Sequence, residues 1–167
     1  TSLTYARFER EAPEPHFSSV HFAEWLRDEV DAIRLLGRDL TITVDTGKLP
    51  ENLCIDLDRK AMPYALRNLL RNAFKYASQR ISVNAELVGN DIHIHVDDDG
   101  IGIPPEEREH IFSAFTRLDR SRDRSTGGYG LGLAIARRVL ELHGGTATAD
   151  ASPLGGARLT LSWKAHQ

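Results

Sequence analysis

Residues 80–100 read RISVNAELVGNDIHIHVDDDG, in which two runs of alternating apolar and polar residues flank Gly89-Asn90. Alternation with a period of two is typical of strands that bury one face, and a Gly-Asn pair between such runs indicates a tight hairpin. We therefore expect two antiparallel strands that end at the three aspartates before Gly100. A sheet with one apolar face needs a covering layer, which the rest of the chain has to supply.

The segments on either side of the hairpin alternate between helical and strand patterns. Further strands are predicted at 40–45, 52–58, 145–151 and 156–163, and helices at 18–37, 58–77, 103–115 (short) and 131–143. Ser18 or Ser19 can cap the first of these helices and Gly37 can end it. Strand pairs interleaved with helices predict an α/β sandwich, with one sheet and helices on one of its faces.

The composition is that of one ordinary globular domain. Of the 167 residues, 41% are hydrophobic and 27% charged, and the net charge of −3 argues against a dedicated nucleic-acid binder. The single cysteine, Cys54, excludes an internal disulfide and a cysteine-based zinc site. No apolar run approaches the length of about 18 residues that a membrane span needs. The chain begins without Met, so we expect it to be part of a longer protein.

The helix predicted at 58–77 has an unusual polar side. Asn68, Asn72 and Lys75 lie together opposite its apolar stripe. Asparagine inside a helix is unfavourable by about 0.5 kcal/mol, so a merely solvated face would favour Glu or Lys instead. An amide oxygen suits Mg²⁺, a lysine one turn on can meet phosphate, and Tyr76 can stack on a base. The alternative is a plain amphipathic helix with a polar outer face.

The aspartates at the end of the hairpin form a second polar group. The segment VDDDGIGIP, 96–104, lacks the spacing and the closing Glu of an EF-hand calcium loop. Asp98, followed by Gly100 and Gly102, instead places a carboxylate beside backbone that permits close approach. This arrangement suits the exocyclic amine of adenine, and the alternative is a solvated turn at a strand end.

Two further patterns lie toward the C-terminus. Phe112 and Phe115 share one face of the short helix, which core packing explains, whereas packing does not require Arg117. The stretch GGYGLGLAIARRVLELHGG, 127–145, places unhindered backbone N–H groups at a helix start, where an anion is favoured. Neither a preceding strand nor a Gly-Lys-Ser/Thr sequence accompanies it, so it is not a dinucleotide fingerprint or a Walker A loop.

In this order, the patterns resemble the N, G1, F, G2 and G3 boxes of a known family. The matching positions are Asn68-x3-Asn72, Asp98-x-Gly100-x-Gly102, Phe112-x2-Phe115, Gly128-x-Gly130-x-Gly132 and Gly155-Gly156. Over residues 20–163 the chain resembles the catalytic, ATP-binding domain of bacterial sensor histidine kinases, in the superfamily of gyrase, a heat-shock chaperone and MutL. The segment before the last helix and the ending GGARLTLSW further resemble the RstB-type subgroup.

The resemblance implies a fold and a domain boundary. The fold would be the Bergerat ATP-binding fold, a two-layer α/β sandwich with a mixed, mostly antiparallel sheet of about five strands. Three main helices would cover one face, and residues 116–129 would form a flexible ATP lid. Residues 1–12 would be the end of a dimerisation and phosphoacceptor helix with its linker, and residues 13–167 the catalytic domain.

The resemblance also implies ATP and Mg²⁺ as cofactors and a role for each matching residue. Asn72, with Asn68 beside it, would ligate Mg²⁺, Lys75 would approach phosphate, and these three would be the catalytic residues. Asp98 would hydrogen-bond the adenine amine. The expected nucleotide contacts are Asn68, Asn72, Lys75, Tyr76, Asp98, Gly100, Gly102, Ile103, Arg117, Gly128, Tyr129, Gly130, Leu131, Gly132 and Leu133.

The implied activity is transfer of the γ-phosphoryl group of ATP to a histidine on an adjoining dimerisation domain, for relay to a response regulator. No histidine here lies in the family's phosphoacceptor setting, and we expect all seven to be structural or solvated: His16, His21, His93, His95, His110, His143 and His166. The whole protein would be an inner-membrane homodimer with this domain in the cytoplasm, and the fragment alone a soluble monomer.

Other activities stay open at this point. An ATPase or a serine kinase of the superfamily carries a carboxylate base one turn before the metal-binding Asn, where this chain has Asn68, whose amide cannot take a proton. A non-catalytic nucleotide sensor would have lost box residues, whereas the matched positions are present. Pro63 departs from the family pattern and predicts that its helix begins nearer Met62 than Asp58.

Overall fold

The hairpin at 80–98 forms the middle of the main sheet. The computed structural model describes residues 14–35, 39–113 and 132–167. In it β4 (Arg80–Val88) and β5 (Asp91–Asp98) pair antiparallel, and the turn between them contains Gly89 with a φ of 62°. The hairpin expected from the alternating pattern is therefore confirmed.

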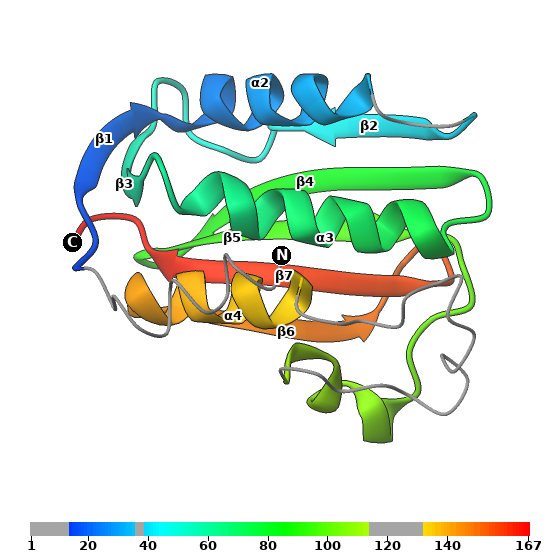
Figure 1. Cartoon of the computed structure of the whole chain (residues 1–167). Coiled ribbons are helices and arrows are strands. Elements are labelled where there is room, and N and C mark those ends of the chain that lie inside the picture. The colour runs from blue at the N-terminus through cyan, green and yellow to red at the C-terminus, as the bar shows by residue number, and fades with distance from the viewer. Residues whose placement is uncertain (1–13, 36–38, 114–131) are drawn as a thin grey trace.

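Three further strands complete this sheet. β2 (Thr41–Asp45) pairs parallel with β4, while β7 (Ala157–Lys164) pairs antiparallel with β5, and β6 (Thr146–Ala151) pairs antiparallel with β7. The strand order is β2-β4-β5-β7-β6 (Figure 1). The expectation of a mixed, mostly antiparallel sheet of about five strands is confirmed.

Among the described residues, three α-helices cover one face of the sheet: α2 (Phe22–Arg34), α3 (Met62–Tyr76) and α4 (Gly132–Leu142) (Figure 1). Their apolar sides and the inward residues of the strands form one hydrophobic core, which includes Phe22, Leu66, Ile94, Leu140 and Trp163. No described helix lies over the opposite face of the sheet, where the other set of alternating residues points. We call this surface the helix-free face.

A separate two-stranded sheet corrects two of the expectations. Residues 17–21 form β1 rather than the start of a helix, and β1 pairs antiparallel with β3 (Cys54–Asp58), which therefore lies outside the main sheet. Ser18 and Ser19 are paired with β3, so they do not cap α2, whose N-cap residue is His21. Pairing over five residues outweighs the local capping signal.

The other departures are smaller. The short helix expected at 103–115 is two 3₁₀ turns, Pro105–Glu107 and His110–Phe112, and Phe112 packs in the core. Short 3₁₀ turns replace a helix there because the two prolines, Pro104 and Pro105, limit the backbone N–H groups available. Helix α3 begins at Met62 with Pro63 in its first turn, as its sequence predicts.

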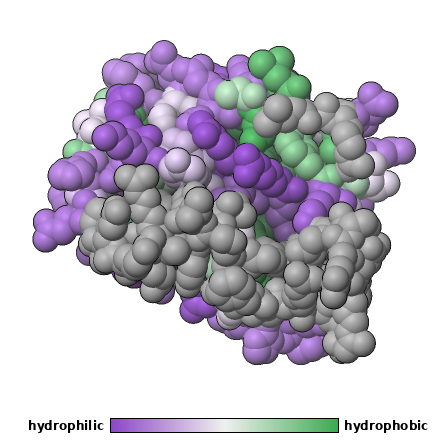
Figure 2. All heavy atoms as spheres, viewed as in Figure 1, coloured by the Kyte–Doolittle hydropathy of each residue, from purple (hydrophilic) through white to green (hydrophobic). Residues whose placement is uncertain are grey.

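Several expectations fall outside the described residues, among them the helix end at 1–12, the helix stop at Gly37, Phe115 and the ATP lid at 116–129. Over the part that the structure describes, no helix is long and apolar enough to cross a membrane. In the space-filling view of the helix-covered side, most of the coloured surface is hydrophilic, with a smaller hydrophobic group of atoms near its upper edge (Figure 2).

Candidate functional site

Helix α3 buries two amide side chains that a purely structural helix would expose. Asn68 and Asn72 are 7% and 8% exposed. The Nδ2 atom of Asn68 donates to the carbonyl oxygen of Tyr64 at 2.8 Å, which leaves its Oδ1 atom facing the start of α4, where a methyl group on Gly132 would come within 3.0 Å. The side chain of Asn72 makes no hydrogen bond to any described residue. Buried polar groups are normally paired, so these amide oxygens are candidates for a ligand.

A small cavity lies between α3 and the end of β5. It is narrow in this structure, and it is lined by Asn72, Tyr76, Asp98, Gly102, Ile103 and Ala157. Five of these six residues are nucleotide contacts expected from the sequence. The cavity therefore joins the side chain of Asn72 to the carboxylate of Asp98, which is 26 residues away along the chain.

Asp98 has one oxygen fixed and one available. Its Oδ1 atom accepts hydrogen bonds from the backbone N–H groups of Gly100 at 2.9 Å and Ala157 at 3.1 Å. Its Oδ2 atom accepts none from the described residues. Burial raises the pKa of this carboxyl above its ordinary value, although the two backbone N–H groups act in the opposite direction. An oriented, desolvated carboxylate with a free oxygen is suited to accept a hydrogen bond from an amine of a ligand.

Two glycines permit the close approach of backbone segments around Asp98. A methyl group on Gly100 would overlap the carbonyl oxygen of Tyr76 at the end of α3. A methyl group on Gly156, just before β7, would overlap Oδ1 of Asp98. Helix α3, the end of β5 and the start of β7 therefore meet because neither position carries a side chain.

Sequence reasoning missed two contacts that shape this region. The backbone N–H of Ala157 anchors Asp98, and the adjacent Gly155-Gly156 pair in the sequence was a signal for it. The carboxylate of Asp99 accepts hydrogen bonds from the N–H groups of Ser78, Gln79 and Arg80, at 2.8 to 3.1 Å, and so holds the connection between α3 and β4. No local pattern in the sequence distinguishes Asp99 from its two neighbours.

Of the other expected site residues, Lys75 and Leu133 are described by the structure and five are not. Lys75 is an exposed residue near the end of α3, and partial burial of its side chain lowers its pKa. Leu133 is 2% exposed and belongs to the core. Arg117, Gly128, Tyr129, Gly130 and Leu131 lie outside the described residues.

The histidines occupy structural or solvated positions. His95 and His143 are buried and hydrogen-bonded, His93 is half-buried, and the remaining four are exposed. Within the described part of the chain, no three His, Cys, Asp or Glu side chains gather as a metal site. The amide oxygens of Asn68 and Asn72 are neutral oxygen donors of the kind that suit a hard cation such as Mg²⁺.

A comparison with family models identifies this arrangement. The model described as histidine kinase-, DNA gyrase B-, and HSP90-like ATPase matches residues 57–167, which is more than half of the chain. The chain belongs to this ATPase family. The matched region includes α3, the residues that line the cavity, and the two glycines Gly100 and Gly156.

Within this ATPase family, the similar proteins are sensor histidine kinases. The sensor protein RstB of Escherichia coli strain K12 is 45% identical over 161 residues, which cover 96% of this chain and 37% of that protein. This similarity agrees with the RstB-type features of the sequence. The chain thus spans little more than a third of the length of this curated relative.

Solved structures in this ATPase family share the fold. The ATP-binding domain of PrrB from Mycobacterium tuberculosis superposes with a TM-score of 0.72 at 27% identity, covering 89% of this chain and 97% of that one. Full-length ShkA in complex with AMPPNP superposes with a TM-score of 0.77 at 26% identity, covering 97% of this chain and 34% of that one. The two-layer α/β sandwich expected from the sequence is therefore the fold of histidine kinase catalytic domains.

Proposed function

We propose that this chain binds ATP with Mg²⁺ and transfers the γ-phosphoryl group to a histidine on a helical dimerisation domain outside the chain. The observation that carries the proposal is the cavity that Asn72 and Asp98 line together. Among the described residues, neither the side chain of Asn72 nor Oδ2 of Asp98 has a hydrogen-bond partner. Family membership and the complex of the similar kinase ShkA with an ATP analogue support the same ligand.

The adenine base would bind at the end of β5. Asp98 Oδ2 is the acceptor for the exocyclic amine, because Oδ1 is already held by two backbone N–H groups. Tyr76, Ile103 and Ala157 line the same cavity and supply apolar surface for the ring. Gly102 leaves room for the base beside them.

The phosphates and the metal ion would lie toward the polar side of α3. Asn72 Oδ1 and Asn68 Oδ1 would hold Mg²⁺, which neutralises phosphate charge and orients the phosphoryl group. Lys75, in the last turn of the helix, would approach phosphate. Arg117 and the glycine-rich segment 127–132 would contact the phosphates, and this part of the proposal rests on the sequence alone.

The absence of a carboxylate next to Asn72 favours histidine as acceptor over water or serine. At position 68 the amide of Asn68 donates to Tyr64 and has no basic atom with which to remove a proton. A neutral imidazole attacks through its unprotonated nitrogen, so an N–P bond forms while the bond between the γ-phosphorus and the β,γ-bridging oxygen breaks and ADP leaves. The chain's work is then positioning and charge neutralisation.

The same proposal covers the rest of the protein. Residues 1–12 would continue from the phosphoacceptor helices, and the catalytic domain would begin near residue 13. The phosphoryl group would pass from the histidine to a response regulator. The whole protein would be a dimeric, membrane-anchored sensor.

A transfer assay tests the proposal. The chain is incubated with γ-labelled ATP, Mg²⁺ and the separately produced dimerisation domain of RstB, and the catalytic domain of RstB serves as positive control. We expect a labelled acceptor whose phosphate is stable to alkali and labile to acid, as a phosphoramidate is. Asn72→Ala should abolish labelling while the far-ultraviolet circular dichroism spectrum stays unchanged.

Each other result indicates a different function. Acid-stable label indicates a hydroxyl acceptor, and phosphate release without label indicates an ATPase. Tight ATP binding without either reaction, beside an active RstB control, indicates a nucleotide-sensing module. Full labelling by a folded Asn72→Ala variant would overturn the site assignment.

A further inference from the structure

Asp97 and Arg158 form a bidentate ion pair on the helix-free face of the sheet. Arg158 Nε donates to Asp97 Oδ1 at 2.8 Å, and Arg158 Nη2 donates to Asp97 Oδ2 at 2.9 Å. Asn84 on β4 also donates to Oδ2, at 3.2 Å. The side chain of Asp97 is only 4% exposed, whereas that of Arg158 is 26% exposed. This geometry is directional, because both partners are planar and both hydrogen bonds must align.

The ion pair lies directly behind the carboxylate that the proposed function assigns to adenine. Asp97 and Arg158 are the last register pair of the β5–β7 ladder. One residue further along each strand, Ala157 donates its N–H to Oδ1 of Asp98, and Gly156 donates its N–H to the backbone oxygen of Asp98. Successive residues of a strand point to opposite faces, so the ion pair and the adenine contact are on opposite sides of the same two strands.

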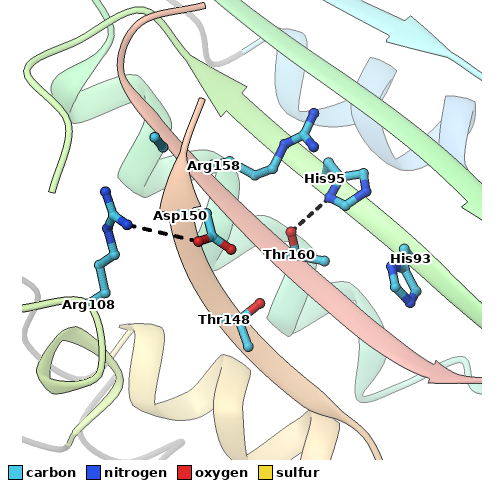
Figure 3. A pocket seen from close by; sticks show the side chains of 8 residues that line it. His93, His95, Arg108, Thr148, Asp150, Arg158 and Thr160 are labelled. Carbon is cyan, nitrogen blue, oxygen red and sulfur yellow. Dashed lines mark hydrogen bonds and ion pairs between the residues drawn. The ribbon is translucent and has the colours of Figure 1, made fainter. Parts of the chain in front are cut away.

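The surroundings of Arg158 indicate that the pair fixes geometry rather than fills space. Arg158 borders an open hollow of about 490 Å³ on the helix-free face, together with His93, His95, Thr148, Thr160 and Asp150 (Figure 3). A buried ion pair adds little net stability relative to apolar residues of similar size, because both charges lose hydration. The Asp97–Arg158 pair instead aligns β5 with β7 at one register position.

We propose that the Asp97–Arg158 pair is a positioning device that aligns Ala157 with Asp98 and thereby sets selectivity for adenine. This inference rests on the proposed function, because it assumes that Asp98 Oδ2 accepts a hydrogen bond from the adenine amine. Neither residue contacts the nucleotide. Loss of the fork lets the start of β7 shift relative to β5, and the carboxylate of Asp98 loses its fixed orientation.

A hydrogen-bonded pair on the same face, His95 with Glu86, provides a control. His95 Nε2 lies 3.0 Å from Glu86 Oε2. His95 Nδ1 lies 2.8 Å from Thr160 Oγ1 (Figure 3). His95 is also on β5 and also bridges to β7, but it lies two residues further from Asp98. Glu86→Gln therefore alters a side-chain contact of the same face that is not hydrogen-bonded to Asp97 or Arg158.

The test measures ATP and GTP affinity by isothermal titration calorimetry with Mg²⁺, for the whole chain and for its variants. Arg158→Gln should bind ATP about tenfold more weakly and GTP with little change, since the orientation of one charged hydrogen bond is lost. Arg158→Lys, which keeps the charge without the fork, should give an intermediate loss if Arg158→Gln fails to fold. Glu86→Gln should leave both affinities unchanged.

A double-variant cycle separates positioning from general destabilisation. In an Asp98→Asn background, Arg158→Gln should cause no further loss of ATP affinity, because the contact it aligns is already gone. Unchanged ATP affinity in folded Arg158→Gln or Arg158→Lys would overturn the inference, and so would equal losses for ATP and GTP. Absence of ATP binding by the unaltered chain would overturn the proposed function and this inference with it.

Discussion

Asp58 and Asp98 both end a strand and are both buried, but their surroundings are opposite in kind. At Asp58 every carboxylate oxygen is occupied. Oδ1 accepts the N–H groups of Lys60 and Ala61 just before α3, and Oδ2 accepts that of His16 before β1. Burial acts to raise the pKa of this carboxyl, but the N–H groups of His16, Ala61 and Lys60 outweigh it, so that the pKa lies below its ordinary value.

At Asp98 only one oxygen is occupied, and the balance is reversed. Burial is the stronger influence, and the pKa lies above its ordinary value. A carboxylate saturated by backbone N–H groups stabilises the fold, whereas one that keeps a free oxygen in a cavity lowers stability until a ligand pairs with it. The comparison therefore supports a structural role for Asp58 and the proposed ligand-binding role for Asp98.

The largest expected effect is a loss of ATP affinity on substitution of Asp98, which distinguishes it from Asp58. In Asp98→Asn the side-chain oxygen stays with the N–H groups of Gly100 and Ala157, so the new NH₂ group faces the ligand. It repels the amine of adenine and suits the oxygen at the same position of guanine. We expect ATP affinity to fall roughly tenfold to hundredfold, since a hydrogen bond to a charged group contributes about 1.5–3 kcal/mol.

The measurement is titration of both nucleotides with Mg²⁺. GTP affinity should stay constant or increase in Asp98→Asn. Equal losses for ATP and GTP would contradict the adenine contact and leave Asp98 with the same structural role as Asp58.

The next effect is on stability. Asp58→Asn places an NH₂ group opposite the N–H of His16, and we expect the free energy of unfolding to fall by about 1–2 kcal/mol. Urea unfolding followed by circular dichroism measures this loss. The ratio of ATP to GTP affinity should be unchanged in the folded variant, and a changed ratio would remove the distinction between the two sites.

The smallest effect is a pH dependence at the Asp58 end of the molecule. His143 Nε2 accepts the backbone N–H of Asp58 at 3.0 Å, so the ring is neutral and its other nitrogen donates to the carbonyl oxygen of Val139. Burial lowers the pKa of His143, against smaller opposing effects from Val139 and Asp58. Below about pH 6.5 the unfolded chain therefore binds a proton that the folded chain does not. The free energy of unfolding decreases as the pH is lowered through this range.

The expected loss from His143 is at most about 1.4 kcal/mol for each pH unit below that value. His95, whose pKa burial also lowers, adds to the same trend, so the comparison needs a variant. His143→Gln should make the decrease in unfolding free energy between pH 6.5 and 5.5 shallower. An identical decrease in both proteins would show that His143 is not the group responsible.

Much of the proposed site could be predicted from the sequence because its residues break local rules. Two asparagines inside a helix and glycines after a strand are each unfavourable in isolation, and they mark Asn68, Asn72, Gly100 and Gly102. The hairpin was readable because alternation and a Gly-Asn turn agree with each other. The start of α3 near Met62 could be predicted because proline is tolerated only in the first turn of a helix, where Pro63 lies.

The remaining features depend on partners that are distant in the chain. Residues 17–21 form a strand because β3 pairs with them, and that pairing competes with a good helix-capping signal at Ser18 and Ser19. The three consecutive aspartates look alike in the sequence, yet they face an arginine on β7, the cavity and the start of β4. Only the register of the strands distinguishes Asp97, Asp98 and Asp99.

A crystal structure of the chain with Mg²⁺ and AMPPNP tests the central claim most directly. It should place the exocyclic amine of adenine within hydrogen-bond distance of Asp98 Oδ2, with Oδ1 still held by Gly100 and Ala157, and Mg²⁺ on Asn72 Oδ1. An adenine ring bound elsewhere, or one that leaves Asp98 Oδ2 without a contact, would contradict the account.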